Sequence, residues 1–275
     1  MKEIDVVNSS IHQRNKGVII LSQGRSGTNW LKSISNATGQ MGKTEEWLSF
    51  NKLSKPIKSY STQSFYDHAL QNASTENGRF SLKIFPRDMH LTRESFGLDF
   101  VRKCMQEQDV KLYLLTREDR VLQAISRLKS DQTNIWHAQE GQAQKEPQRQ
   151  LRYNFRKLCL YYFEIGRQFE FWRSYLAINQ FEHETFTYES LLPNPAPFFE
   201  STAKHLDVPP PTRYESAFKI QRDAITEDWC QRFSEDIKAH GVHPGTYHLR
   251  QPNATLSNAL KLLTGRPFKA PGGWY

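Results

Sequence analysis

The stretch GVIILSQGRSGTNW, from Gly17 to Trp30, decides the fold. Residues 17–22 form a nearly continuous apolar run, typical of a strand that is buried on both faces of a parallel sheet. A short loop with two glycines follows, and the pattern over 28–38 then predicts a helix that Gly39 closes. A strand, a glycine-rich turn and a helix N-terminus in this order are the parts of a phosphate-binding loop.

Strand and helix patterns alternate along the rest of the chain. Further strands are predicted at 80–85, 110–116 and 181–188, and further helices at 94–106, 119–130, 148–177 and 195–207. This alternation predicts an α/β fold in which helices flank both faces of a mostly parallel central sheet. In such sheets, ligands bind beyond the carboxyl ends of the strands.

The chain is expected to form one domain over its 275 residues, with 1–16 and about 250–275 peripheral. Residues 40–79 and 131–150 are predicted to be long insertions over the carboxyl ends of the strands.

Composition narrows the function classes only slightly. Lys and Arg number 37 against 29 Asp and Glu, a net charge of +8 that suits an anionic partner of any kind. The three cysteines are far apart, so we expect neither a disulfide framework nor a zinc site. No early apolar run resembles a signal peptide and no window approaches a membrane span, so a cytoplasmic location is expected.

The loop after the first strand is predicted to hold an anion. Gly24 and Gly27 let backbone N–H groups approach it, Arg25 adds charge, and the helix N-terminus adds its partial positive charge. The predicted site comprises Gln23, Gly24, Arg25, Ser26, Gly27, Thr28 and Asn29. A triphosphate-binding loop needs a lysine where Thr28 stands, so magnesium-assisted triphosphate chemistry loses support.

Two segments together resemble sulfotransferases that use 3′-phosphoadenosine-5′-phosphosulfate (PAPS). ILSQGRSGTNWL resembles their 5′-phosphosulfate loop, and LYLLTREDRVLQAISRLKSDQTNIW over 112–136 resembles the segment that binds the 3′-phosphate. The resemblance is nearest to bacterial carbohydrate sulfotransferases of the trehalose 2-sulfotransferase and nodulation-factor types. It implies a P-loop-type three-layer fold, PAPS as sulfuryl donor, and 3′-phosphate binding by Arg117 and Ser126. The planar fork of arginine suits phosphate oxygens.

Sulfuryl transfer to a hydroxyl needs a general base. The resemblance implies a glutamate base at the end of a G-x-x-x-E run, which by counting from Gly42 is Glu46, with the neighbouring Glu45 left open. Neighbouring residues of an extended chain point in opposite directions, so we expect only one of the two carboxylates to face the site. Lys83, at the end of the second strand, resembles a lysine of the bacterial enzymes, and we assign it with Glu46 and Arg25 to the catalytic group.

The remaining assignments concern the two substrates. Glu45, Trp47, Gln132 and Trp136 are predicted on the acceptor side, and Gln221 and Arg222 on the nucleotide side. Ile220 stands where the family has an arginine, which leaves the role of that last segment open. No histidine cluster suggests a metal site, so none is predicted.

The leading hypothesis is therefore a PAPS-dependent sulfotransferase that acts on a hydroxyl of a carbohydrate or glycolipid by in-line transfer. A P-loop kinase of a small molecule and a non-catalytic nucleotide- or RNA-binding module are the alternatives. The resemblance leaves open whether the protein is a homodimer, and the acceptor itself is not identified.

Overall fold

A computed structural model of the chain describes residues 14–136, 151–215 and 223–243. Its strands are β1 (Lys16–Leu21), β2 (Phe80–Ile84), β3 (Asp109–Thr116) and β4 (Glu184–Thr187). They form one sheet in the order β2-β1-β3-β4, and every pairing is parallel. The helices are α1 (Thr28–Ala37), α2 (Thr62–Ala73), α3 (Pro86–Phe96), α4 (Phe100–Glu107), α5 (Arg120–Thr133), α6 (Phe155–Asn179), α7 (Tyr188–Leu191), α8 (Ala196–Leu206) and α9 (Ala224–His240). Short 3₁₀ turns occupy Phe50–Lys52 and Ile57–Ser59.

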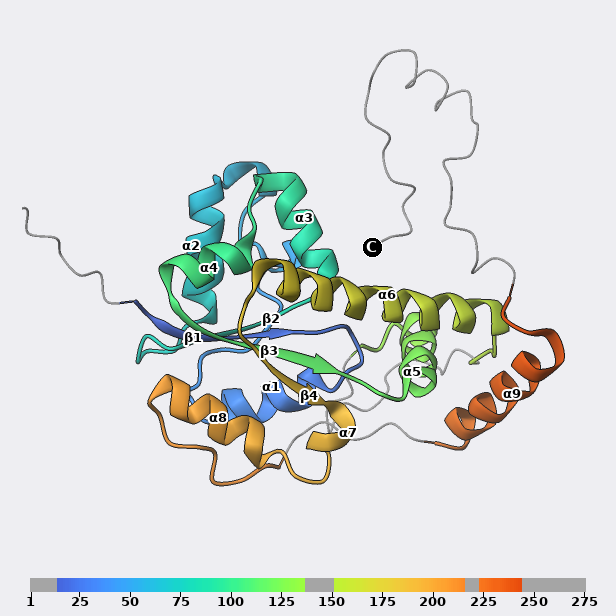
Figure 1. Cartoon of the computed structure of the whole chain (residues 1–275). Helices are drawn as coiled ribbons and strands as arrows, with labels where there is room; N and C mark the ends of the chain where they lie inside the picture. The colour runs from blue at the N-terminus through green and yellow to red at the C-terminus, as the bar shows by residue number, and fades with distance from the viewer. Residues whose placement is uncertain (1–13, 137–150, 216–222, 244–275) are drawn as a thin grey trace, which may run out of the picture.

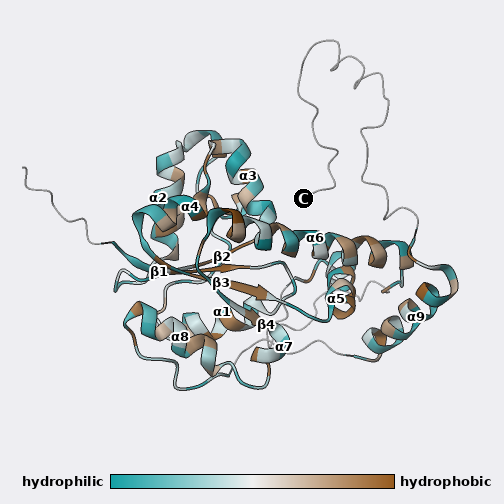
Figure 2. Ribbon diagram, in the orientation of Figure 1, coloured by the Kyte–Doolittle hydropathy of each residue, from teal (hydrophilic) through white to brown (hydrophobic). Residues whose placement is uncertain are grey.

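Three layers result, as the sequence predicted. Helices α2, α4 and α6 cover one face of the sheet, and α1 and α8 cover the other (Figure 1). Alternate residues of β1 divide between the two cores: Ile19 and Leu21 face α2 and α6, whereas Val18 and Ile20 face α1 and α8. Both faces are buried, which explains why β1 reads as an unbroken apolar run, and Figure 2 shows the central strands as hydrophobic.

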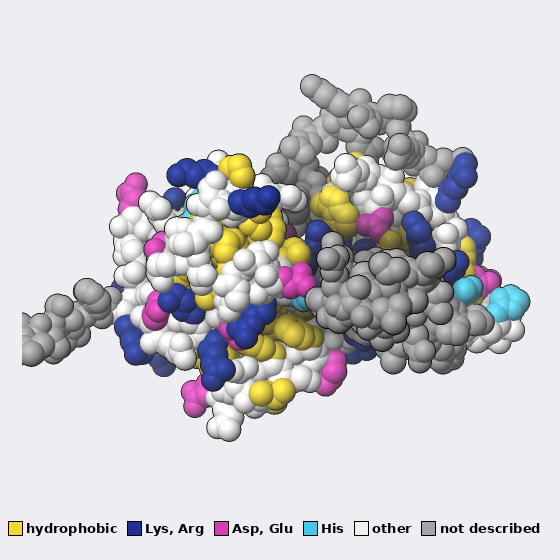
Figure 3. Space-filling view, turned by 90° about the horizontal axis from the view of Figure 1, so that it is seen from above, with side chains coloured by type: hydrophobic (Ala, Val, Ile, Leu, Met, Phe, Trp, Pro, Cys, Tyr) yellow, Lys and Arg dark blue, Asp and Glu magenta, His cyan; other side chains and the backbone are white. Residues whose placement is uncertain are grey.

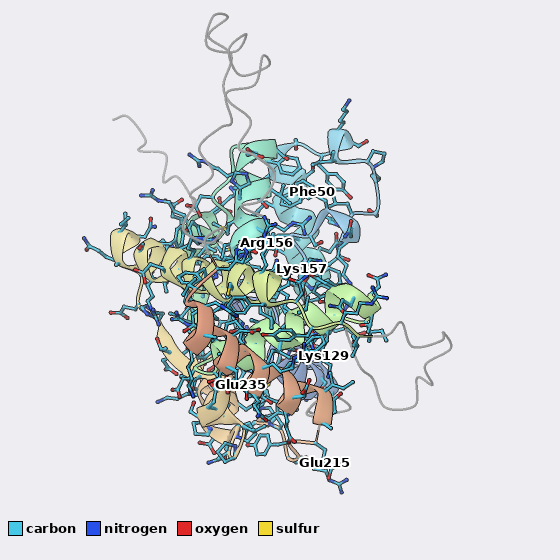
Figure 4. All side chains as sticks on the ribbon, turned by 90° about the vertical axis from the view of Figure 1, so that its right-hand side faces the viewer. Phe50, Lys129, Arg156, Lys157, Glu215 and Glu235 are labelled. Atoms are coloured by element: carbon cyan, nitrogen blue, oxygen red, sulfur yellow. The ribbon has the colours of Figure 1, made fainter. Side chains whose placement is uncertain are left out.

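Side-chain caps set where several helices begin. Asp99, Asp119, Asn154 and Asp223 are the N-caps of α4, α5, α6 and α9, and each side chain accepts a backbone N–H from three residues further on. Lys129 of α5, labelled in Figure 4, donates to the Asp223 carboxylate (2.8 and 2.7 Å) and so ties the start of α9 to α5.

Several predicted boundaries were wrong. The helix predicted at 94–106 is two helices, because Gly97 adopts φ 63° and ends α3, after which Asp99 caps α4. Helix α6 begins only at Phe155, after the cap Asn154, and not at 148. Strand β4 is limited to Glu184–Thr187, because Thr187 caps α7. Residues 40–79 include the helix α2, and the expected peripheral segment 1–16 ends inside β1, whose first residue is Lys16.

Candidate active site

The loop between β1 and α1 has the shape of an anion cradle. Arg25 and Gly27 both have positive φ values, 68° and 84°, which turn the chain sharply before the helix. A Cβ atom on Gly24 would meet nothing within 4 Å, whereas one on Gly27 would lie 2.5 Å from the Tyr188 ring. Gly27 is also the N-cap of α1 and provides no side-chain cap. The first turn of α1 therefore presents its N–H groups and its partial positive charge toward the loop.

Hydrogen bonds from three other elements fix this loop. Ser22 Oγ donates to the Leu115 carbonyl of β3 (2.7 Å), and Trp172 Nε1 of α6 donates to the Ser22 carbonyl (2.8 Å). The buried amide of Gln123 on α5 donates to the Gly24 carbonyl and to Ser26 Oγ, both at 2.9 Å. Gln123 was not among the residues predicted for the site, although it lies in the 112–136 segment that resembles the 3′-phosphate-binding segment.

Ser26, one of the predicted anion-site residues, has its hydroxyl hydrogen-bonded within the loop and to α5. Its Oγ donates to the Gln23 carbonyl (2.7 Å) and accepts from Gln123, and the residue is fully buried. Gln23 and Thr28 are also buried, at 8% and 3% exposure. A ligand at this loop would therefore meet mainly backbone N–H groups and the open edge at Gly24.

Arg25 and Arg117 meet next to Ser126. Arg25 Nε donates to Ser126 Oγ (2.8 Å), and Arg117 donates to the Arg25 carbonyl (3.0 Å). The two predicted phosphate sites are thus joined through the side chain of Arg25. Burial, and then the neighbouring positive charge of Arg117, lower the pKa of Arg25.

Two side chains of α7, Tyr188 and Glu189, contact Arg117. Its guanidinium lies 4.8 Å from the centre of the Tyr188 ring, and its Nε is 3.7 Å from Glu189. Glu189 also accepts the N–H groups of Glu118 and Asp119 (2.9 and 3.3 Å). The segment TYES therefore positions the arginine that follows β3.

Two of the predicted acceptor-side residues, Gln132 in the last turn of α5 and Trp136 just after it, have different surroundings. The Trp136 carbonyl accepts a hydrogen bond from Arg25 (2.7 Å), and the Trp136 residue is 43% exposed. Gln132 is 2.7 Å from both the N–H and the carbonyl of Arg152, one bond through each end of its amide. Gln132 thus joins α5 to the chain before α6, and its assignment to the acceptor stays a prediction. Gln221 and Arg222 lie outside the described residues.

A second polar cluster surrounds Lys83 at the end of β2. Lys83 pairs in register with Ile20 of β1, and its side chain is completely buried. Its ammonium group donates to Asn29 Oδ1 on the first turn of α1 (2.5 Å) and lies 3.0 Å from Glu46 Oε1. It is also 3.7 Å from Glu45 Oε1. Lys83 therefore links the phosphate-loop helix to both candidate bases.

Both glutamates contact this lysine, so their carboxylates do not point in opposite directions as neighbours on an extended chain would. The chain is not extended at this point, because a turn begins there, closed by the bond from Ser49 N to the Glu46 carbonyl (3.0 Å). The two carboxylates nevertheless differ in their partners. Glu45 also contacts Lys32 and Lys52, whereas Glu46 is 29% exposed and pairs with Lys83 alone among the described lysines and arginines.

The pKa of Glu45 reflects those partners. Burial alone would raise it, but the charge of Lys83 and hydrogen bonds from Lys32 and the Glu46 N–H outweigh burial and lower the pKa to about 2. Glu45 is therefore a firmly ionised anchor for lysines and a poor proton acceptor.

The backbone before these glutamates is clamped to β2. The side-chain amide of Asn36 accepts the Thr44 N–H (2.8 Å), and Thr44 Oγ1 donates to Ser81 Oγ (2.8 Å). Lys83 N then donates to the Glu45 carbonyl (3.1 Å). Gly42 permits this close approach, because a Cβ atom there would lie 2.3 Å from the Ser81 nitrogen. Trp47, predicted on the acceptor side, is half-buried and donates to the Lys43 carbonyl (2.6 Å).

Asp88 is a carboxyl group that sequence reasoning missed. It lies on the first turn of α3 and is only 6% exposed. Burial, and then the charge of Glu46, raise its pKa to about 7.

The described residues hold no group of three or more His, Cys, Asp or Glu arranged to bind a metal ion. Within the same ranges, no helix has the length and apolar character needed to cross a membrane.

Comparison with known proteins agrees with this geometry. The model of a family described as Stf0 sulphotransferase matches residues 17–236, which is most of the chain. The matched range begins at the residue that opens GVIILSQGRSGTNW and includes the Lys83, Glu46 and Arg117 clusters. A search of curated proteins found no match.

Proposed function

The chain belongs to the Stf0 sulfotransferase family and is a PAPS-dependent sulfotransferase, and we propose that it sulfates a hydroxyl of a carbohydrate or glycolipid with Glu46 as general base. The proposal includes one sulfotransferase domain that uses no metal ion. A reducing, cytoplasmic location is part of the proposal, supported by the buried thiols of Cys104 and Cys159, which form no disulfide among the described residues.

The donor is proposed to lie across the ends of β1 and β3. The 5′-phosphosulfate would contact the loop from Gln23 to Asn29 and the N-terminus of α1, where aligned N–H groups favour an anion. Arg117 and Ser126, with Gln221 and Arg222 from outside the described residues, would hold the 3′-phosphate. Arg25 lies between the two sites and is proposed to stabilise the charge that grows on the leaving phosphate.

The observation that carries the proposal is the position of Lys83. Its buried ammonium group contacts Asn29 beside the phosphate loop and Glu46 on the opposite side. A base held this way lies next to the group that is transferred, whereas Arg117 and Ser126 lie on the far side of the loop. Lys83 would also stabilise the transferred sulfuryl oxygens, which carry negative charge.

The proposed step can be written with its atoms balanced. The acceptor O–H bond breaks, the proton moves to a Glu46 oxygen, and the acceptor oxygen forms a new bond to sulfur. The bond between sulfur and the bridging oxygen breaks, and 3′-phosphoadenosine-5′-phosphate leaves with that electron pair. Glu46 is preferred to Glu45, because a carboxylate that several lysines keep ionised down to a pKa of about 2 accepts a proton poorly.

The acceptor would enter beside Glu46, next to the half-buried side chain of its neighbour Trp47, and the exposed Trp136, whose carbonyl is held by Arg25, is proposed as a further contact. Aromatic faces of this kind suit a sugar ring, whose axial C–H groups are apolar. No observation favours the alternatives of kinase or RNA-binding module. On the part of this face that the described residues form, Figure 3 shows Lys and Arg side chains at scattered positions.

Thermal stability and turnover test the proposal together. At 100 times its Kd, 3′-phosphoadenosine-5′-phosphate should stabilise the wild-type protein by about 2.7 kcal/mol. Arg117→Ala should weaken that binding about 10- to 100-fold, because it removes charge-assisted hydrogen bonds. Glu46→Gln should bind the nucleotide normally and lower kcat about 10²- to 10⁴-fold. Full activity of Glu46→Gln across pH would show that the base is another residue.

A further inference from the structure

Gln123 is a fully buried amide on α5 that reaches the phosphate loop. Its Nε2 donates to the Gly24 carbonyl and to Ser26 Oγ, both at 2.9 Å, and the residue is 0% exposed. Ser26 Oγ in turn donates to the Gln23 carbonyl (2.7 Å). Because a hydroxyl group has one proton to donate, Ser26 Oγ must accept from Gln123, and the nitrogen side of the amide therefore faces the loop.

The other side of the same amide has no partner. Among the described residues, no donor reaches Gln123 Oε1, although this atom is buried. A buried acceptor that lacks a donor weakens a fold, whereas an apolar side chain of the same length would fill the space without that cost. The contribution of the amide group therefore lies in the two bonds from its nitrogen, both of which end on the loop.

These bonds set the direction of two peptide groups in the loop. The carbonyls of Gln23 and Gly24 are held by the buried pair of Ser26 and Gln123. In a trans peptide, C=O and N–H point in opposite directions, and the described residues contain no cis peptide. The N–H groups that share those two peptides belong to Gly24 and Arg25, so they point to the side of the loop opposite the buried pair. With Arg25 at φ 68°, successive N–H groups turned to one side form a concave site for an anion.

We propose, on the premise that PAPS binds as described above, that Gln123 is a positioning residue that turns the N–H groups of Gly24 and Arg25 toward the 5′-phosphosulfate. Ser126, which is proposed to hold the 3′-phosphate, lies about one helical turn further along α5. Helix α5 thus fixes the 5′ loop through Gln123 and carries a ligand of the 3′-phosphate. This arrangement sets the distance between the two anion sites, and it favours a nucleotide that carries a phosphate at both positions.

The competing role for a buried residue on α5 is to fill the core. Gln123→Met separates the two roles, because methionine has a similar length and volume but donates no hydrogen bond. Gly24 is partly exposed, so its carbonyl can accept from water instead. The matched control is Leu128→Met, a volume-conserving change on the same helix at a fully buried core position.

The test is the binding of two nucleotides, measured by isothermal titration calorimetry. The first is 3′-phosphoadenosine-5′-phosphate, and the second is adenosine 3′-monophosphate, which has no 5′-phosphate. Gln123→Met should weaken binding of the first about 5- to 50-fold and of the second less than about twofold, because only the loop loses its order. Leu128→Met should leave both affinities within about twofold of wild type, and the Tm values of the two variants should lie within about 5 °C of each other.

The outcomes separate this inference from the donor site on which it rests. If wild-type protein binds the two nucleotides equally well, the 5′-phosphate has no site in the loop and the proposed donor placement is wrong. If wild-type protein prefers 3′-phosphoadenosine-5′-phosphate and Gln123→Met keeps the whole preference, Gln123 only fills the core and this inference alone fails. Equal weakening of both nucleotides would contradict it too, because the effect would not be specific to the loop.

A second variant covers the case in which Gln123→Met does not fold. Gln123→Glu keeps the length and shape of the side chain, but its ionised carboxylate donates no hydrogen bond to the Gly24 carbonyl. It should show the same selective loss of 3′-phosphoadenosine-5′-phosphate binding, by at least as large a factor, since its charge also repels the 5′-phosphate. If Gln123→Glu retains the wild-type preference, or if neither variant folds, Gln123 serves the core and the inference is overturned.

Discussion

Lys83→Met offers the sharpest physical test of the site, because it removes one charge from a completely buried position. The methionine has a similar length and fills the same space. Glu46, 3.0 Å away, and Asn29, 2.5 Å away, would both lose their donor, and Glu45 would lose its contact at 3.7 Å. The perturbation is therefore mainly electrostatic and does not create a large cavity.

Its magnitude follows from the partners that remain. Removing one partner of a buried ion pair typically costs about 3–5 kcal/mol. The cost should be lower here, because Glu46 is 29% exposed and can turn toward water, and Glu45 keeps Lys32 and Lys52. We expect a loss of about 2–4 kcal/mol in the free energy of unfolding. For a chain of this size that lowers Tm by roughly 5–10 °C.

Thermal unfolding followed by circular dichroism measures this loss. Lys58→Met is the control, since Lys58 is exposed and makes no ion pair among the described residues, and we expect its effect to stay within about 0.5 kcal/mol. The double variant Lys83→Met/Glu46→Gln should regain part of the lost stability, because the stranded carboxylate is gone. If Lys83→Met is as stable as Lys58→Met, Lys83 is not held as the structure describes.

Two further predictions concern the backbone clamp and the charge network. Gly42→Ala should destabilise the protein by about 2 kcal/mol or more and lower kcat, because its Cβ atom would lie 2.3 Å from the Ser81 nitrogen. Gly39 has a similar φ of 65°, but a Cβ atom there would meet nothing within 4 Å. Gly39→Ala should therefore lose less stability and less turnover in the same unfolding and turnover assays. Glu45 has its pKa lowered to about 2, so its stabilisation is present above about pH 4.5 and is lost as the pH falls toward 2. Between pH 5 and pH 3, the free energy of unfolding of the wild-type protein should therefore fall by about 1–2 kcal/mol more than that of Glu45→Gln, after allowance for solvent screening. If the unfolding free energies of the two proteins change in parallel with pH, the lysine network around Glu45 is contradicted.

The core of the fold could be predicted from the sequence, because residues that are neighbours in the chain carry the signals for its strands, turns and helices. The apolar run before Ser22 and the two glycines after it are enough to place β1, the loop and α1. Some signals were present but not used. Gly97 followed by Asp99 is a helix stop and a new cap, and Asn154 before Phe155 marks the true start of α6.

Other features of the site had no local signal. Arg25 and Ser126 are 101 residues apart in sequence, so their hydrogen bond depends on the whole sheet being assembled. Nothing in the pattern of β2 indicates that Lys83 is buried, because a lysine in a strand usually lies at an exposed edge. The difference between Glu45 and Glu46 likewise arises from Lys32 and Lys52, which come from a helix and a 3₁₀ turn that the chain brings together only on folding.

The strand order is compatible with the in-line transfer proposed above. Strand β1 lies between β2 and β3. The loop after β1 therefore lies between Arg117, which directly follows β3, and Lys83, which is near the end of β2. In an in-line displacement, the attacking oxygen approaches sulfur on the side opposite to the one from which the leaving oxygen departs. A donor held over β3 and a base held over β2 would meet that condition with the phosphosulfate on the loop between them. The order β2-β1-β3 thus suits the proposed transfer over β1, in which the nucleotide and the acceptor would lie on opposite sides of Arg25.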